Sequence, residues 1–245
     1  HIALSWIPEI SQAVCGQSWE VWVMTARVKE IKATVLAVLI TVGIGVQFTQ
    51  ARAASAETLT VAGGCFWCVE SDFESVRGVR EVVSGYTGGT VKNPTYKQVT
   101  RGGTGHYEAV QIKYDPGQVS ARQLLDLFFR SIDPTDSGGQ FCDRGNSYRT
   151  AVFVAGPGQE QAAKAAKSAA MQALGRQIVT PILNAGKFYK AEDYHQDYYK
   201  GEKRVLTRFG PKRQSEAYKA YRKACKRDER VRQLWGDAAP FAGKH

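Results

Sequence analysis

The sequence predicts an α+β fold in which helices cover one face of a sheet. Segments that alternate polar and apolar residues, as strands do, are interspersed with segments of helical spacing, in the order strand, helix, strand, strand, helix, strand. That order is the ferredoxin-like split β-α-β arrangement, a two-layer core. Glycine-rich stretches between the elements predict long decorating loops, and a basic C-terminal tail with helical spacing predicts a further helix.

Each element has its own signal. Gly63 and Gly64 let the backbone turn out of the first strand, and the apolar residues that follow recur at helical spacing. The next two strands alternate in polarity and are joined by a long polar loop. Ser120 can cap the second helix, and Pro134 stops it. The expected elements are a strand at 59–62, a helix after residue 65, strands at 79–87 and 107–114, a helix at 121–131, a strand at 148–154, a helix at 159–174, a strand at 178–183 and an amphipathic helix at 215–235.

The N-terminal part of the chain does not look like the core of this fold. Residues 1–23 lack a clean helix or strand period and begin with His, so we interpret them as translation from upstream of the true start. Residues 24–53 have the layout of a secretory signal peptide, in which basic residues precede the apolar run 33–46 and a small-x-small cleavage site follows. A membrane anchor is the alternative, although the run is shorter than the roughly 20 residues that span a bilayer. We therefore expect an exported protein, periplasmic or secreted, with a single domain in residues 54–245 and no stable membrane association after cleavage.

The chain is basic, with a formal net charge of +10. Most of this charge lies in residues 200–245, which hold 14 Lys and Arg against 5 Asp and Glu. A basic tail can bind nucleic acid, but acids and aromatics at helical spacing in residues 215–235 favour a solvated amphipathic helix. We expect no nucleic-acid partner and a monomer.

Cys65 is the candidate nucleophile. It lies at the predicted strand-to-helix turn, where unpaired N–H groups and the helix dipole favour a thiolate and lower the cysteine pKa. Cys68 follows at a spacing that permits a disulfide. The pair could instead be buried small hydrophobes or half of a zinc site. Phe66 and Trp67 disfavour a tight metal knuckle and favour an apolar wall beside the thiolate, so we expect no metal. The four cysteines of residues 54–245 are too few to staple a domain of this length, which favours redox chemistry over structural bridges.

Five motifs in one order carry a resemblance to a known family. They are G-C-F-W-C-V-E at 64–70, S-G-Y-T-G-G at 84–89, N-P-T-Y at 93–96, G-H-Y-E at 105–108 and A-E-D-Y-H-Q at 191–196. With them the chain resembles the A-type peptide-methionine sulfoxide reductases, closely over residues 57–188 and more loosely to residue 235. The resemblance implies reduction of methionine S-sulfoxide, free or in proteins, which repairs proteins after oxidation.

The resemblance also implies roles for particular residues. Cys65 would be the nucleophile, and Asp143 would act through water from behind the oxygen-binding residues. Phe66 and Trp67 would hold the substrate methyl group, and Tyr96, Glu108 and Tyr148 would bind the sulfoxide oxygen. His106 and His195 are expected to be structural.

The chemistry independently asks for an acid near the thiol. An oxygen leaves a sulfoxide sulfur only when protonated, and a carboxyl in an aromatic, low-dielectric pocket has its pKa raised, so Glu108 suits a general acid. Cys65 would end as a sulfenic acid, which a second thiol condenses to a disulfide. An external thioredoxin-like dithiol would then restore it, with no bound cofactor. The alternative function is a general thiol–disulfide oxidoreductase that uses the Cys65/Cys68 pair.

Three cysteines could resolve the sulfenic acid. Cys68 is nearest along the chain. Cys225 lies in the basic tail, where neighbouring cations would lower its pKa, and the resemblance makes a C-terminal thiol plausible. Cys142 is adjacent to Asp143, whose carboxylate opposes thiolate formation. We predict Cys68, with Cys225 and Cys142 as the alternatives.

Overall fold

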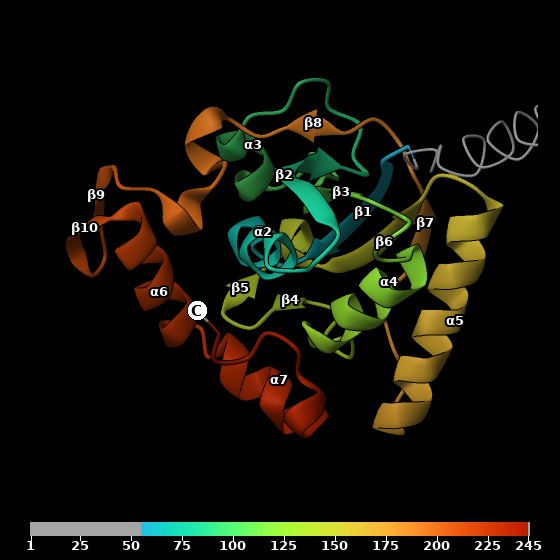
Figure 1. Ribbon diagram of the computed structural model, residues 1–245. Helices are drawn as coiled ribbons and strands as arrows, with labels where there is room; N and C mark the ends of the chain where they lie inside the picture. The colour runs from blue at the N-terminus through green and yellow to red at the C-terminus, as the bar shows by residue number, and fades with distance from the viewer. Residues whose placement is uncertain (1–54, 245) are drawn as a thin grey trace, which may run out of the picture. The chain divides into compact units, whose positions relative to one another are not determined.

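The computed structural model describes residues 55–244 (Figure 1). The interpretations of residues 1–23 and 24–53 lie outside this range. The strands are β1 (Glu57–Gly63), β2 (Val79–Thr87), β3 (Tyr107–Tyr114), β4 (Gly139–Gln140), β5 (Asp143–Arg144), β6 (Thr150–Val154), β7 (Ile182–Asn184), β8 (Tyr189–Lys190), β9 (Arg204–Thr207) and β10 (Gly210–Arg213). The helices are α2 (Phe66–Glu74), α3 (Tyr96–Arg101), α4 (Ala121–Arg130), α5 (Pro157–Leu174), α6 (Gln214–Ala224) and α7 (Arg227–Trp235), with 3-10 turns η1 (Asn146–Tyr148), η2 (Asp193–His195), η3 (Tyr198–Lys200) and η4 (Gly236–Ala238).

The main sheet has six strands in the order β7-β6-β1-β3-β2-β8. Its four central strands pair antiparallel, and β7 joins the edge parallel to β6, so the sheet is mixed. Helix α2 connects β1 to β2, while α4 follows β3 and packs against α5, and Figure 1 shows α4 and α5 side by side. This organisation confirms the predicted α+β class. Among the residues described here, no helix has the length and apolar character needed to cross a membrane.

Strand alternation explains why the main core lies where it does. On β3, Val110 and Ile112 belong to the large core cluster, which also contains the buried Phe128 and Phe129 of α4. Side chains two residues apart share one face of a strand, so Glu108 lies on the same face as Val110. The core-facing side of the sheet therefore carries one carboxyl group among apolar side chains.

The sequence locates the long, half-buried strands better than the short elements. Strands β2 and β3 have the predicted bounds, because each alternates over eight or more residues. The predicted loop at 88–106 contains helix α3, whose capping box joins Thr95 and Gln98. The expected strand at 178–183 is shorter and begins at Ile182, and the strand expected from residue 148 begins at Thr150 after η1.

The basic tail differs most from its prediction. Instead of one helix at 215–235, a β9–β10 hairpin precedes α6 and α7, and the two helices are separated at Lys226, whose φ of 57° is left-handed. Arg222 and Arg227 are only 4% and 2% exposed, which contradicts a purely solvated face. Arg222 lies 2.9 Å from an Asp72 carboxylate oxygen of α2, and Arg227 donates to two backbone carbonyls. The tail is therefore anchored by buried cations.

Candidate active site

Cys65 is the N-cap of α2, at the predicted strand-to-helix turn. Its carbonyl accepts the N–H groups of Cys68 at 3.1 Å and Val69 at 3.4 Å, which starts the helix. The turn needs glycine before it. Gly64 has a φ of +83°, and a Cβ there would lie 2.6 Å from the Cβ of Gln140. This backbone arrangement places Cys65 at the N-terminus of α2.

Cys65 and Cys68 are both buried and both free thiols, and they are hydrogen-bonded to each other. Burial raises the pKa of Cys65, and the hydrogen bond to Cys68 raises it further. The expected lowering at the helix N-terminus is therefore wrong for this state, because desolvation outweighs the helix dipole. The pKa of Cys68 is lowered, first by the hydrogen bond from Cys65 and then by the charges of Arg227 and Arg222. Of the cations next to Cys225 in the tail, Arg227 thus acts on Cys68.

Glu108 lies beside the same helix start. Its Oε2 accepts the backbone N–H of Phe66 at 3.1 Å, and its side chain is almost inaccessible, with 1% of the residue exposed. Oε1 has no hydrogen-bond partner within residues 55–244. Burial raises the pKa of Glu108 to about 8, which the hydrogen bonds from the Phe66 N–H and the Tyr148 hydroxyl only partly offset. A carboxyl group that is protonated at neutral pH thus faces the site, in agreement with the sequence argument.

Tyr96 and Tyr148 bring two phenol groups close to Glu108 and Cys65. Burial and the nearby charge of Glu108 raise the pKa of both hydroxyls, so they stay protonated donors. Tyr96 starts α3, where Glu192 accepts its backbone N–H at 2.9 Å and the Tyr86 hydroxyl at 2.9 Å. Glu192 therefore ties α3 to the sheet, a role that the sequence argument missed.

Phe66 and Trp67 form an aromatic wall with His195 of the A-E-D-Y-H-Q segment and with Tyr198, two residues beyond it. Trp67 stacks on Tyr198 with ring centroids 3.8 Å apart, and its Nε1 donates to Nδ1 of His195 at 3.2 Å. His195 lies 5.0 Å from Phe66 and 4.4 Å from Tyr96 between ring centroids. Burial lowers the pKa of His195 to about 4, so the ring is neutral and can accept this hydrogen bond. The A-E-D-Y-H-Q motif included His195, but its spacing along the chain could not show that His195 contacts Phe66, Trp67 and Tyr96.

Asp143 of β5 stands at the edge of this group. It accepts a hydrogen bond from the Tyr221 hydroxyl of α6, a partner that the sequence argument missed. Burial raises the pKa of Asp143, whereas that hydrogen bond and the charges of Arg227 and Arg208 lower it. The Asp143 charge in turn contributes to the raised pKa of Glu108. The eight predicted site residues other than Cys225 and Cys142 therefore lie in one group of neighbouring side chains.

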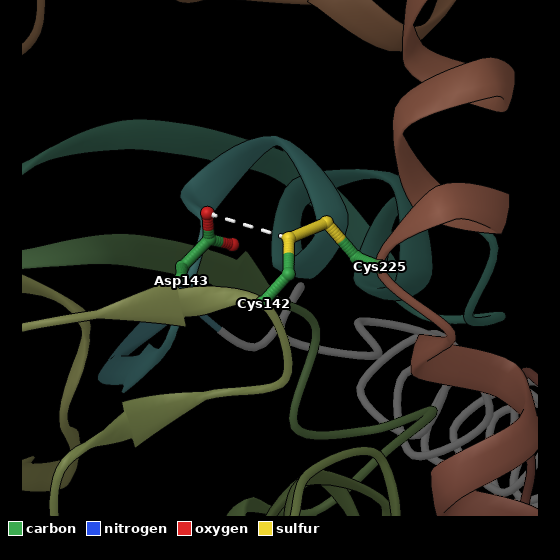
Figure 2. Close-up of side chains that lie close together, drawn as sticks. All are labelled: Cys142, Asp143 and Cys225. Atoms are coloured by element: carbon green, nitrogen blue, oxygen red, sulfur yellow. Dashed lines mark hydrogen bonds between the residues drawn. A yellow bond between two sulfur atoms is a disulfide. The ribbon is translucent and has the colours of Figure 1, made fainter.

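The other two candidate cysteines are joined to each other. Figure 2 shows the Cys142–Cys225 disulfide, with the Cys142 sulfur 3.9 Å from Oδ1 of Asp143. The sequence argument kept Cys142 and Cys225 as separate candidates and did not foresee that they pair with each other. The three side chains bring metal-ligand atoms together, but sulfurs bonded to each other are not thiolate ligands.

A second group of possible metal ligands lies where α2 meets the residue that precedes η3. It consists of Glu70, Glu74 and Asp197. The Lys200 ammonium lies 2.8 Å from a carboxylate oxygen of both Glu74 and Asp197, so a cation already balances these charges. Neither gathering indicates a metal centre.

Comparisons with known proteins agree with this chemistry. The family model described as "Peptide methionine sulfoxide reductase" matches residues 57–238. Similar proteins include a peptide methionine sulfoxide reductase MsrA 2 of Rhizobium meliloti, 50% identical over 79% of this chain and 90% of the relative, and one of Caulobacter vibrioides, 49% identical over 74% and 86%.

Solved structures give the same result. Methionine sulfoxide reductase A of Corynebacterium diphtheriae superposes with a TM-score of 0.55 at 36% identity, over 59% of this chain and 74% of that one. Mxr1 of Saccharomyces cerevisiae in reduced form superposes with a TM-score of 0.57 at 31% identity, over 59% and 84%. The chain therefore belongs to the peptide methionine sulfoxide reductase family and is a peptide-methionine (S)-S-oxide reductase.

Proposed function

We propose that Cys65 attacks the sulfur of methionine S-sulfoxide while Glu108 donates a proton to the departing oxygen. Cys68, whose pKa is lowered, is the thiolate of the pair and takes the Cys65 proton through the hydrogen bond between them, and the resulting Cys65 thiolate forms the new bond to sulfur. The protonated oxygen then moves as hydroxide from the substrate sulfur to the Cys65 sulfur. The substrate sulfur–oxygen bond and the new sulfur–sulfur bond both break, methionine leaves, and Cys65 ends as a sulfenic acid. The observation that carries this proposal is the buried, raised-pKa carboxyl of Glu108 beside the Cys65 turn.

Substrate binding uses the groups around this pair. Phe66 and Trp67 form the wall against which the substrate methyl group packs, since their rings stand next to Cys65 in the chain. The hydroxyls of Tyr96 and Tyr148 hold the sulfoxide oxygen, because their raised pKa values keep them as donors. Asp143 acts through water from behind them.

Activity with each epimer tests the function. The purified protein, dithiothreitol and either methionine S-sulfoxide or methionine R-sulfoxide are mixed, and methionine is measured. We expect turnover of the S epimer only, and none with Cys65→Ser. A protein with an intact Cys65 thiol that reduces neither epimer would overturn the proposal. Exchange with a scrambled protein disulfide tests the alternative, a general thiol–disulfide oxidoreductase.

We further propose that Cys68 resolves the sulfenic acid. Its sulfur attacks that of Cys65, a disulfide forms and water leaves. The support is that Cys65 and Cys68 are free thiols in contact, whereas Cys225 and Cys142 are bonded to each other. After oxidation with one equivalent of methionine S-sulfoxide and blocking of free thiols, peptide mass mapping should find a Cys65–Cys68 link. If the first disulfide instead joins Cys65 to Cys225 or Cys142, that cysteine and not Cys68 resolves the sulfenic acid.

The reductant that we propose is an external thioredoxin-like dithiol. Its two thiols reduce the Cys65–Cys68 disulfide and become a disulfide themselves, so the protein needs no bound cofactor. Its substrates are free methionine sulfoxide and oxidised proteins. We propose a monomer without a nucleic-acid partner, because Arg222 and Arg227 of the basic tail are buried and bound within the protein.

Two further proposals concern the chain as a whole. Export would follow cleavage of residues 24–53 near residue 53, and N-terminal sequencing of the protein from its host tests this. An intact N-terminus at Met24 in a cytosolic fraction would contradict export. We also propose the ferredoxin-like description for β6-β1-β3-β2, since their order and antiparallel pairing support it.

A further inference from the structure

Two links connect the C-terminal end of α6 with the active site. Tyr221 donates its hydroxyl hydrogen to Oδ2 of Asp143, and its ring stands edge-on to Trp67 with centroids 6.3 Å apart. One turn later, the N–H of Cys225 donates to the carbonyl of Tyr221 at 2.9 Å. Cys225 is bonded to Cys142, the residue that precedes Asp143 (Figure 2). A hydrogen bond and a disulfide thus join the same two segments.

The hydrogen bond from Tyr221 and the disulfide both bear on Asp143, whose charge affects Cys65 and Glu108. Asp143 raises the pKa of Cys65 and of Glu108, so it lies within electrostatic range of both. The other charged groups that face Asp143 are Arg227 of α7 and Arg208 in the turn between β9 and β10. Neither makes a hydrogen bond to Asp143 that fixes its orientation, whereas the Tyr221 hydroxyl does.

We propose that Tyr221 is a positioning residue that holds the Asp143 carboxylate toward the sulfoxide site, and that the Cys142–Cys225 disulfide fixes Tyr221 in this place. The inference rests on the proposed function, in which Asp143 stands behind the sulfoxide oxygen. Cys142 and Cys225 therefore stay bonded throughout turnover. They belong to the scaffold of the site, and the thiol cycle runs through Cys65 and Cys68.

Kinetics of two variants test the proposal in the full chain. Tyr221→Phe and the double variant Cys142→Ser/Cys225→Ser should each raise KM for methionine S-sulfoxide by about fivefold to tenfold, the factor expected for one hydrogen bond, with kcat changed less than about twofold. Combining all three substitutions should add little to the larger effect, because both changes release the same carboxylate. The proposal would be overturned by an unchanged KM in Tyr221→Phe. It would also be overturned if the KM changes of Tyr221→Phe and of the double serine variant multiplied in the combined variant.

A matched tyrosine provides the control. Tyr199 also donates its hydroxyl to a carboxylate, that of Glu74, but not in the sulfoxide site. Tyr199→Phe should leave KM unchanged, which separates loss of positioning from loss of a tyrosine–carboxylate bond in general. If the disulfide were instead part of the thiol cycle, the double serine variant would lose multiple turnover with a thioredoxin-like dithiol while KM stayed unchanged.

Two measurements do not depend on activity. Carbon NMR of the Asp143 carboxyl should show a higher pKa in Tyr221→Phe, because a donor to the charged form has been removed. Hydrogen exchange at the C-terminal turn of α6 should accelerate in the double serine variant. An unchanged Asp143 pKa in Tyr221→Phe, or unchanged exchange in the serine variant, would refute the proposal even if the wild type reduced no sulfoxide. Tyr221→Phe keeps both cysteines, so its result stands even if the serine variant does not fold.

Discussion

Glu108 combines two properties that seldom occur together in one side chain. It is buried on the core-facing side of the sheet, and its Oε1 has no hydrogen-bond partner within residues 55–244. Burial without a cation keeps the acid protonated, and the oxygen without a partner is free to form a new hydrogen bond. This is the protonation state that the proposed proton donation by Glu108 requires.

Replacement of this acid by its amide should affect the rate and the pH profile together. Glu108→Gln should lower kcat/KM by about 10²-fold to 10⁴-fold, the usual contribution of a general acid. Wild-type kcat/KM should fall as the pH rises through about 8, because the ionised carboxylate has no proton to give. The variant should lack this alkaline limb, and kcat/KM measured across that range checks it. Glu81→Gln, an exposed carboxyl paired with Lys113, is the control and should behave as wild type.

The same pKa shift predicts how stability depends on pH. The pKa of Glu108 rises from 4.5 to about 8 on folding, so the unfolded chain ionises first. Its contribution is therefore fully present below about pH 4.5 and is lost as the pH rises to about 8. The wild type should lose a few kcal/mol of unfolding free energy over this window relative to Glu108→Gln, with about 5 kcal/mol as the ceiling. Urea unfolding at both ends of the window measures the difference, and parallel pH profiles would contradict it.

At the scale of the element, the turn before α2 decides where the nucleophile lies. Gly64→Ala should lower the free energy of unfolding by about 2 to 4 kcal/mol, because the left-handed backbone is strained and the new Cβ meets Gln140. Gly175→Ala is the control, since its φ is also positive, at +62°, but nothing lies within 4 Å. It should cost only about 1 to 2 kcal/mol. Equal losses in urea unfolding would show that the contact with Gln140 is unimportant.

The elements that were predictable are those with enough residues to display a period. Alternation identified β2 and β3 to the residue, whereas β4, β5 and β8 have two residues each and show no pattern. The break after α6 contains neither Gly nor Pro, so a single helix was expected there. In the site, Cys65 to Trp67 are contiguous and were found. Tyr221 and Glu192 lie 78 and 96 residues from their partners Asp143 and Tyr96, and only tertiary structure connects them.

For the molecule as a whole, the buried Arg222 and Arg227 bind helices α6 and α7 to α2 and to the end of β1. Arg222→Leu would leave the Asp72 carboxylate buried, with the Arg227 guanidinium 3.7 Å away as a weaker ion-pair partner. We expect a loss of about 3 to 5 kcal/mol in unfolding free energy, measured with urea. Arg213→Leu removes only an exposed pair with Glu202 and should cost less than about 1 kcal/mol. A similar small loss for both variants would contradict the anchoring role.

The disulfide also makes part of the chain a covalent ring. Cys142 and Cys225 are 83 residues apart, and the ring they close contains β6, α5 and the β9–β10 hairpin, while Cys65 and Glu108 lie outside it. Leu206 in that hairpin is 85% exposed, which makes the hairpin accessible to proteases. One cut there therefore leaves a single molecule on a non-reducing gel, and two fragments separate only after the bridge is reduced.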